Sequence, residues 1–211
     1  MTKKQRAVLV IQELEKLYPE VAIPLDHFDP YTLLVAVALS AQTTDKKVNE
    51  VTPILFSHAK TPFEMRKLEV EEIKELIKEI GLSNTKAKNL KAMAEMLVEK
   101  HNGVVPQSFE ELEELPGVGH KTASVVMAQA FNIPAFPVDT HIHRLMTQWK
   151  LSEGKNVKQV EKDAKKLFPK DKWNKLHIQI ILYGREYSPA RGKGEKDFLT
   201  KMLFEKPIKR A

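Results

Sequence analysis

Residues 115–123 read Leu-Pro-Gly-Val-Gly-His-Lys-Thr-Ala. Pro116 cannot continue a preceding helix, and Gly117 and Gly119 permit backbone angles with positive φ. A second helix then begins near His120, and the unpaired N–H groups of its first turn and of the glycine hairpin form an anion site. Such a hairpin would hold a nucleic acid by its phosphate backbone, without reading bases. On this local pattern alone, an ordinary tight turn between two helices is an equally good explanation.

Lys121 is a candidate nucleophile. It lies in the first turn of the helix that follows the hairpin, where the helix dipole disfavours a cation. That position favours the neutral amine, which is the form that attacks carbon and builds a Schiff base. The alternative on local evidence is a surface lysine that contacts a phosphate.

Asp139 is a second candidate, because it precedes a helical run and suits the N-cap position. As a catalytic group, its carboxylate would face positive charge developing on a sugar ring or take a proton from Lys121. A purely structural cap is the alternative. His141 and His143 follow, but residues two apart on a helix point in different directions, so we expect no metal site.

Helical periodicity extends over nearly the whole chain, and alternating strand-like runs are not evident. We therefore predict an all-α fold with helices over 8–17, 31–41, 46–57, 70–80, 85–100, 108–115, 120–131, 140–149, 157–168 and 172–183. Gly81, Gly103 and Gly184 are among the predicted stop signals. The stretch 134–137, Pro-Ala-Phe-Pro, is the predicted crossing between two domains.

Composition narrows the possible function classes. The chain has 211 residues, is 42% hydrophobic, carries a net charge of +6 and contains no cysteine. Without cysteine, a disulfide, a thiolate nucleophile and an all-cysteine iron–sulfur cluster are excluded. The basic balance favours a polyanionic partner such as nucleic acid. The longest nearly apolar stretch, 31–41, is about half of the roughly 20 residues that a membrane span needs, and no signal peptide is evident. We expect a cytoplasmic monomer with no membrane partner.

Further segments accompany 115–123 and 138–144 along the chain. They are 39–45 (Leu-Ser-Ala-Gln-Thr-Thr-Asp), 81–87 (Gly-Leu-Ser-Asn-Thr-Lys-Ala), 101–106 (His-Asn-Gly-Val-Val-Pro), 154–157 (Gly-Lys-Asn-Val) and 182–185 (Leu-Tyr-Gly-Arg). In this order, the segments resemble the endonuclease III family of helix-hairpin-helix DNA glycosylases. The resemblance covers roughly residues 5 to 186.

The resemblance implies a two-domain helix-hairpin-helix DNA glycosylase architecture with a DNA-binding cleft between the domains. One domain would be a six-helix domain over 22–133, and the other would join 1–21 to 134–211. The chain would act at the nucleoid in base excision repair, on double-stranded DNA that contains damaged bases or abasic sites. In the family, the lysine matching Lys121 attacks C1′ of an oxidised pyrimidine nucleotide, and the Schiff base then cuts the strand by β-elimination. The aspartate matching Asp139 assists.

Extrusion of a nucleotide leaves a gap in the duplex that some side chain must fill. By resemblance, Gln42 and Leu82 are the candidates, although locally Leu82 could be a core residue and Gln42 a buried hydrogen-bonding residue. We expect further DNA contacts from the hairpin, from the segment after Asp139 and from a basic loop. These residues are Pro116, Gly117, Val118, Gly119, His120, Thr122, His141, Arg144, Arg191 and Lys193.

The chain departs from the family after residue 185. Many members carry a four-cysteine iron–sulfur cluster there, whose positions are occupied here by Ser188, Glu195, Phe198 and Phe204. We therefore expect no cofactor and no metal. In place of the cluster, we predict that four apolar side chains pack against the second domain, namely Phe198, Leu199, Met202 and Leu203.

Other functions on the same fold stay open at this point. Adenine glycosylases of the fold lack the hairpin lysine and use a glutamate in the helix matching 37–39, where this chain has no acid. An 8-oxoguanine glycosylase/lyase and an enzyme reduced to abasic-site cleavage both keep the lysine and the aspartate. A non-enzymatic module that binds damaged DNA would need neither Lys121 nor Asp139 at those positions.

Overall fold

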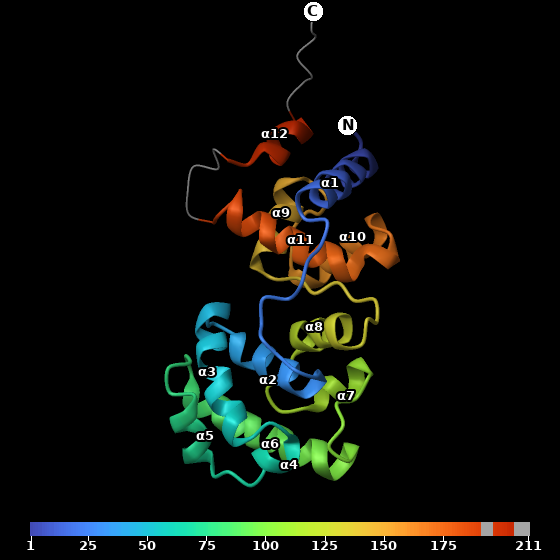
Figure 1. The fold of residues 1–211 in the computed structure, drawn as a ribbon. Helices are drawn as coiled ribbons and strands as arrows, with labels where there is room; N and C mark the ends of the chain where they lie inside the picture. Colours follow the sequence, from blue (N-terminus) through green and yellow to red (C-terminus); the bar gives the residue numbers. More distant parts are fainter. Residues whose placement is uncertain (191–195, 205–211) are drawn as a thin grey trace, which may run out of the picture. The chain divides into compact units, whose positions relative to one another are not determined.

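The computed structural model describes residues 1–190 and 196–204, and within them it contains helices and no strand. The chain forms two compact units (Figure 1). One consists of Met1–Ile23 with Pro134–Ala211, and the other of Pro24–Ile133. No helix within the described ranges is long and apolar enough to cross a membrane.

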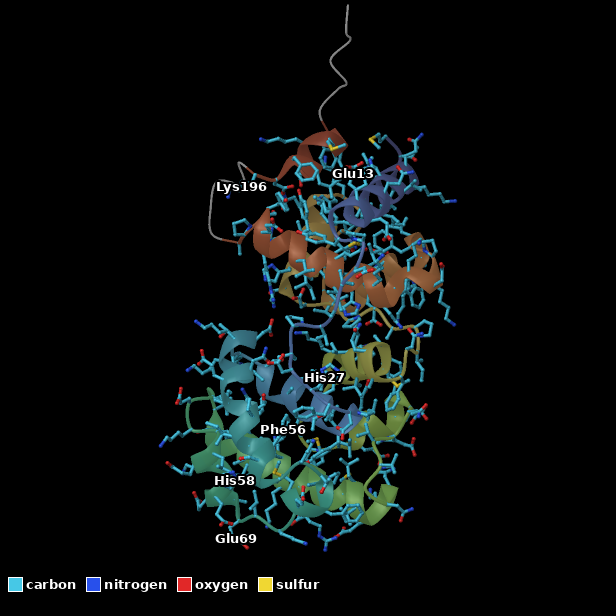
Figure 2. All side chains as sticks on the ribbon, viewed as in Figure 1. Glu13, His27, Phe56, His58, Glu69 and Lys196 are labelled. Carbon is cyan, nitrogen blue, oxygen red and sulfur yellow. The ribbon has the colours of Figure 1, made fainter. Side chains whose placement is uncertain are left out.

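The unit 24–133 is built around one helix that is buried on nearly every side. Its helices are α2 (Pro30–Ser40), α3 (Asp45–His58), α4 (Pro62–Met65), α5 (Val70–Leu76), α6 (Ser83–His101), α7 (Phe109–Glu114) and α8 (His120–Ala130). Asp29 caps α2 through the Thr32 N–H at 2.8 Å, and Pro30 occupies its first turn. α2 packs against α3, α6 and α8. Figure 2 shows side chains filling this interior, among them the labelled Phe56 of α3.

The other unit joins the first helix to those that follow Pro134. Its helices are α1 (Lys3–Leu17), α9 (Thr140–Gln148), α10 (Val157–Leu167), the 3₁₀ helix η1 (Lys170–Lys172), α11 (Trp173–Glu186) and α12 (Phe198–Phe204). Their apolar faces share one core that includes Leu14, Phe136 and Trp149. Arg6 of α1 donates to the carbonyls of Trp149 at 2.9 Å and Lys150 at 2.8 Å, which ties α1 to the end of α9.

Three of the predicted helix ends are wrong. The helix predicted over 8–17 begins at Lys3, where Thr2 forms the N-cap. The helix predicted over 70–80 ends at Leu76, after which the Ile80 N–H donates to the Ile77 carbonyl in a turn. Gly184, predicted as a stop, lies inside α11, which continues to Glu186. A Cβ at Gly184 would lie 2.9 Å from Nδ1 of His141. Glycine at this position therefore allows α9 and α11 to approach closely, and it does not end the helix.

The segment after residue 196 is held by a buried carboxylate. Asp197 is 3% exposed and accepts from the Tyr183 hydroxyl at 2.7 Å, from Gln148 Nε2 at 2.7 Å and from the Thr200 N–H at 3.0 Å. Burial by itself raises the pKa of Asp197, but hydrogen bonds from Tyr183, Thr200 and Ser188 outweigh it and lower the pKa below its usual value. We call these five residues the Asp197 network.

α12 packs with one face only. Leu199 and Leu203, one helical turn apart, are buried in the core, as predicted. Phe198 is partly buried and meets the Tyr187 ring edge-on, with centroids 5.5 Å apart. The prediction is wrong for Met202, which is 43% exposed.

Candidate functional site

The hairpin between α7 and α8 contains a tight turn, residues 115–118, that requires glycine at its third position. The Val118 N–H donates to the Leu115 carbonyl at 3.0 Å, and Gly117 has φ of +81°. A Cβ at Gly117 would also lie 3.0 Å from the side chain of Asn89 on α6. Left-handed backbone and the close approach of α6 both call for glycine here.

Gly119 has no such internal requirement. It is the N-cap of α8 with φ of −99°, an angle that other residues adopt easily, and a Cβ built on it meets no heavy atom within 4 Å. Neither the backbone angle nor a neighbouring atom within the protein therefore requires a glycine at position 119. The open space lies at the N-terminus of an 11-residue helix, where an anionic group of a ligand can approach the first N–H groups.

His120, the first residue of α8, contacts α7, and Lys121 is the next residue of α8. The Nδ1 atom of His120 lies 2.7 Å from a carboxylate oxygen of Glu113, and its ring stacks on Phe109 with centroids 5.5 Å apart. Both partners come from α7, so this side chain fixes α8 relative to α7. Lys121 is exposed in the first turn of α8, beside the open space at Gly119.

Gln42 and Leu82 lie on neighbouring loops, and both have the left-handed backbone conformation that is uncommon for residues other than glycine. Their φ angles are +58° and +62°, both residues are exposed, and Leu82 is 60% exposed. A Cβ at Gly81 would lie 3.6 Å from the Gln42 carbonyl oxygen, so the two loops are in contact range. Neither residue is the buried one that local sequence allowed. Left-handed non-glycine residues on exposed loops are strained and concentrate at functional sites.

Helix α6 connects these loops to the hairpin. Leu82 is its N-cap and Asn89, seven residues on, touches Gly117. Seven residues of helix span about 10 Å. One rigid element of the unit 24–133 therefore carries the exposed Leu82 at its start and supports the hairpin two turns later.

Asp139 belongs to the other unit and is the N-cap of α9, as predicted. Its Oδ1 accepts from the Ile142 N–H at 2.8 Å, which fixes the carboxylate at the helix N-terminus. The His141 ring packs against Gly184, and burial lowers the pKa of His141 although the Asp139 charge opposes the shift. Arg144 donates from Nη1 to the Ser188 hydroxyl at 2.9 Å.

Arg191 and Lys193 lie outside the described residues. Lys196, which follows them in the sequence, is exposed and is labelled in Figure 2. The assignment of Arg191 and Lys193 to DNA stays a prediction.

Comparison with known proteins identifies the family. The model of the HhH-GPD superfamily of base excision DNA repair proteins matches residues 35–170. Endonuclease III of Synechocystis sp. is 44% identical over 90% of this chain and 87% of its own length. Endonuclease III of Escherichia coli K12 is 43% identical over 89% of each chain. The chain belongs to the endonuclease III family.

A solved structure of endonuclease III has the same fold as this chain. The structure of a trapped endonuclease III–DNA covalent intermediate matches with a TM-score of 0.87 and 40% identity, over 91% of this chain and 90% of that one. The fold class predicted from the sequence, a helical helix-hairpin-helix glycosylase, is thereby confirmed.

The sequence did not identify two residues, Lys86 and Asn89, that support the Gln42 loop and the hairpin. Lys86 is 8% exposed, and its ammonium binds oxygens of the 39–43 segment. Asn89 contacts the hairpin glycine. No local sequence signal identifies either residue, because their partners lie in other segments of the chain.

Proposed function

We propose that the chain is a bifunctional DNA glycosylase and abasic-site lyase of base excision repair, which removes oxidised pyrimidines from double-stranded DNA. One observation carries the proposal. An exposed amine, Lys121, lies within the first turn of α8, two residues after Gly119, where no contact inside the protein requires a glycine. A phosphate held at Gly119 brings the adjoining nucleotide within reach of that amine.

The reaction begins with the neutral amine of Lys121 attacking C1′ of the extruded nucleotide. The glycosidic bond breaks, its electron pair leaves with the base, and the base takes up a proton. Ring opening gives a C1′ Schiff base, which lets a proton leave C2′ and the C3′–O bond break. Water then hydrolyses the Schiff base and frees the lysine. Asp139 stabilises positive charge on the sugar and accepts the proton that the amine loses.

Gln42 and Leu82 fill the space that the extruded nucleotide leaves. The support is their shared exposure and left-handed backbone on adjacent loops. An amide can hydrogen-bond to the unpaired opposite base, and a leucine can occupy the apolar gap in the stack. The hydrogen bond and the apolar contact then offset part of the free energy that is lost when the base leaves its pair and the stack.

Borohydride trapping tests the proposal directly, because borohydride reduces the Schiff base to a stable crosslink. The unmodified protein is incubated with one duplex that carries thymine glycol and one that carries an abasic site. We expect a crosslink on both duplexes. A crosslink on the abasic duplex alone would indicate a lyase only, or a different preferred lesion, and none on either would indicate a binding module. A duplex with 8-oxoguanine, run in parallel, tests the alternative base.

The hairpin glycines give a separate prediction. We expect Gly119→Ala to weaken binding of an abasic duplex about tenfold or more, since a methyl group then occupies the space offered to the phosphate, while the melting temperature falls by only a few degrees. Gly117→Ala should lower the melting temperature more, because it strains a φ of +81° and presses on Asn89. Fluorescence anisotropy and circular dichroism melting measure the two effects. Equal loss of stability in both variants would contradict this division of roles.

A further inference from the structure

The turn that carries Gln42 has a definite type. Residues 40–43 form a four-residue turn in which the Thr43 N–H donates to the Ser40 carbonyl at 3.1 Å. Ala41 has φ of −59° and ψ of 116°, and Gln42 has φ of +58°. These angles define a type II turn, whose third residue is normally glycine. A glutamine at that position is strained, so some other group must hold the turn in this form.

Type I and type II turns differ chiefly in the peptide between their two central residues. The type I form turns this peptide over, so that its carbonyl points to the opposite side and the third residue returns to negative φ. Here the peptide in question is Ala41–Gln42. Whatever binds the Ala41 carbonyl in its present direction therefore selects the type II form.

Lys86 binds that carbonyl. Its Nζ donates to the Ala41 oxygen at 2.6 Å, to the Leu39 oxygen at 2.9 Å and to the Thr43 hydroxyl at 3.2 Å. An ammonium has three donors, and all three are used here. The first two acceptors lie at the C-terminal end of α2, where the helix dipole favours a cation. Burial lowers the pKa of Lys86, and these oxygens replace the water that the ammonium has lost.

We propose that Lys86 is the positioning residue that forces Gln42 into its left-handed backbone, and so aims the Gln42 side chain at the space left by an extruded nucleotide. The same residue lies in the first turn of α6, where its backbone N–H donates to the Leu82 carbonyl at 3.0 Å. The residue whose side chain holds the Gln42 turn therefore lies one helical turn after Leu82. This inference rests on the proposed function, in which Gln42 and Leu82 stabilise extrusion.

Lys86→Met tests the proposal, since methionine has similar length and no donors. Lys88→Met is the matched control, because Lys88 is an exposed lysine on the same helix. Two single-turnover rates are compared: excision of thymine glycol, and cleavage of a duplex with a preformed abasic site. Extrusion costs most when a base must leave the stack and least at an abasic site. We expect Lys86→Met to slow excision by about 10²-fold and abasic cleavage by only a few-fold, because small misplacements at a reacting site carry penalties of that size.

The fluorescence of 2-aminopurine placed opposite the lesion reports extrusion itself, and the rise seen with unmodified protein should be largely lost in Lys86→Met. A nuclear Overhauser effect between the Ala41 α-proton and the Gln42 amide proton, strong in a type II turn, should weaken in the variant. If Lys86→Met is too unstable to assay, Thr43→Val removes one of the three acceptors alone and should shift the ratio of the two rates in the same direction.

Equal slowing of both reactions would overturn the proposal, because Lys86 would then act on the chemistry or on folding in general. A Lys86→Met protein with an unchanged rate ratio and an unchanged Overhauser effect would also overturn it, as would Thr43→Val with an unchanged ratio. Failure of the proposed function looks different: the unmodified protein would then excise no thymine glycol and form no crosslink.

Discussion

Lys121→Ala should abolish the borohydride crosslink on both the thymine glycol and the abasic duplex. The side chain is the only group of the hairpin that can form a Schiff base with C1′. We expect the rate of strand cleavage to fall by about 10³-fold or more, because only binding and electrostatic effects remain when a nucleophile is removed. Gel analysis of reduced reactions measures the crosslink, and the cleaved strand gives the rate.

Binding should survive the same substitution. Lys121 is exposed, so we expect circular dichroism melting to be unchanged and the abasic duplex still to bind. Lys74→Ala, which replaces a lysine of α5 that pairs with Glu71, serves as the control and should behave like the unmodified protein. Persistent crosslinking in Lys121→Ala would mean that another amine is the nucleophile, and would remove the basis for the proposed mechanism.

Asp197→Ala should destabilise the protein more than any of the other substitutions proposed above. Removing the carboxylate leaves the Tyr183 hydroxyl, the Gln148 amide and the Thr200 N–H without their acceptor inside the protein. Each buried group left unpaired costs roughly 1–3 kcal/mol, so we expect about 4 kcal/mol in total, with the melting temperature roughly 10 °C lower.

Tryptophan fluorescence isolates this effect. The two tryptophans of the sequence, Trp149 and Trp173, both lie in the unit that contains Asp197. In Asp197→Ala, the melting temperature followed by tryptophan fluorescence should therefore fall more than the one followed by circular dichroism. Circular dichroism reports the helices of both units. Asp171→Ala is the control, because Asp171 is exposed in the same unit. A fluorescence midpoint within a degree or two of the control would contradict the proposed role of the Asp197 network.

Acid should weaken the Asp197 network in a predictable direction. The folded pKa of Asp197 lies below its usual value, so its contribution to stability is fully present above the unfolded pKa of about 4. The contribution is lost as the pH falls through the lower folded pKa. In Asp197→Asn that part of the pH dependence should be missing, and the difference in urea midpoint between the two proteins should shrink between about pH 5 and pH 2. A difference that stays constant over this range would contradict the lowered pKa.

Local rules were sufficient for the parts of the fold and site that local chemistry determines. The Pro-Gly-x-Gly hairpin, the cap at Asp139 and the helical periodicity each depend on residues within one or two turns of each other. The role of Gly184 could not be predicted, because it depends on His141 of another helix, and neither sequence spacing nor propensity records that approach. Met202 was misassigned for a related reason: an apolar run predicts burial, but the packing of α12 decides which face is covered.

Lys86 shows a different limit. A lysine between Thr85 and Ala87 is typical of an exposed helix face, and nothing nearby in the sequence indicates that it is buried. Its partners lie 43 to 47 residues away, at the end of α2 and in the turn after it. The left-handed backbone of Gln42 and the burial of the Lys86 ammonium both depend on the hydrogen bond from Lys86 to the Ala41 carbonyl. Only the three-dimensional structure shows that bond.

The Asp197 network also bears on how the protein is made. A segment closed by hydrogen bonds from Tyr183, Gln148 and Thr200 is complete once the chain has been translated and folded. Because the sequence contains no cysteine, no thiolate ligand takes part in closing this segment. Since the sequence contains no cysteine, oxidants such as peroxide have no thiol in it to attack.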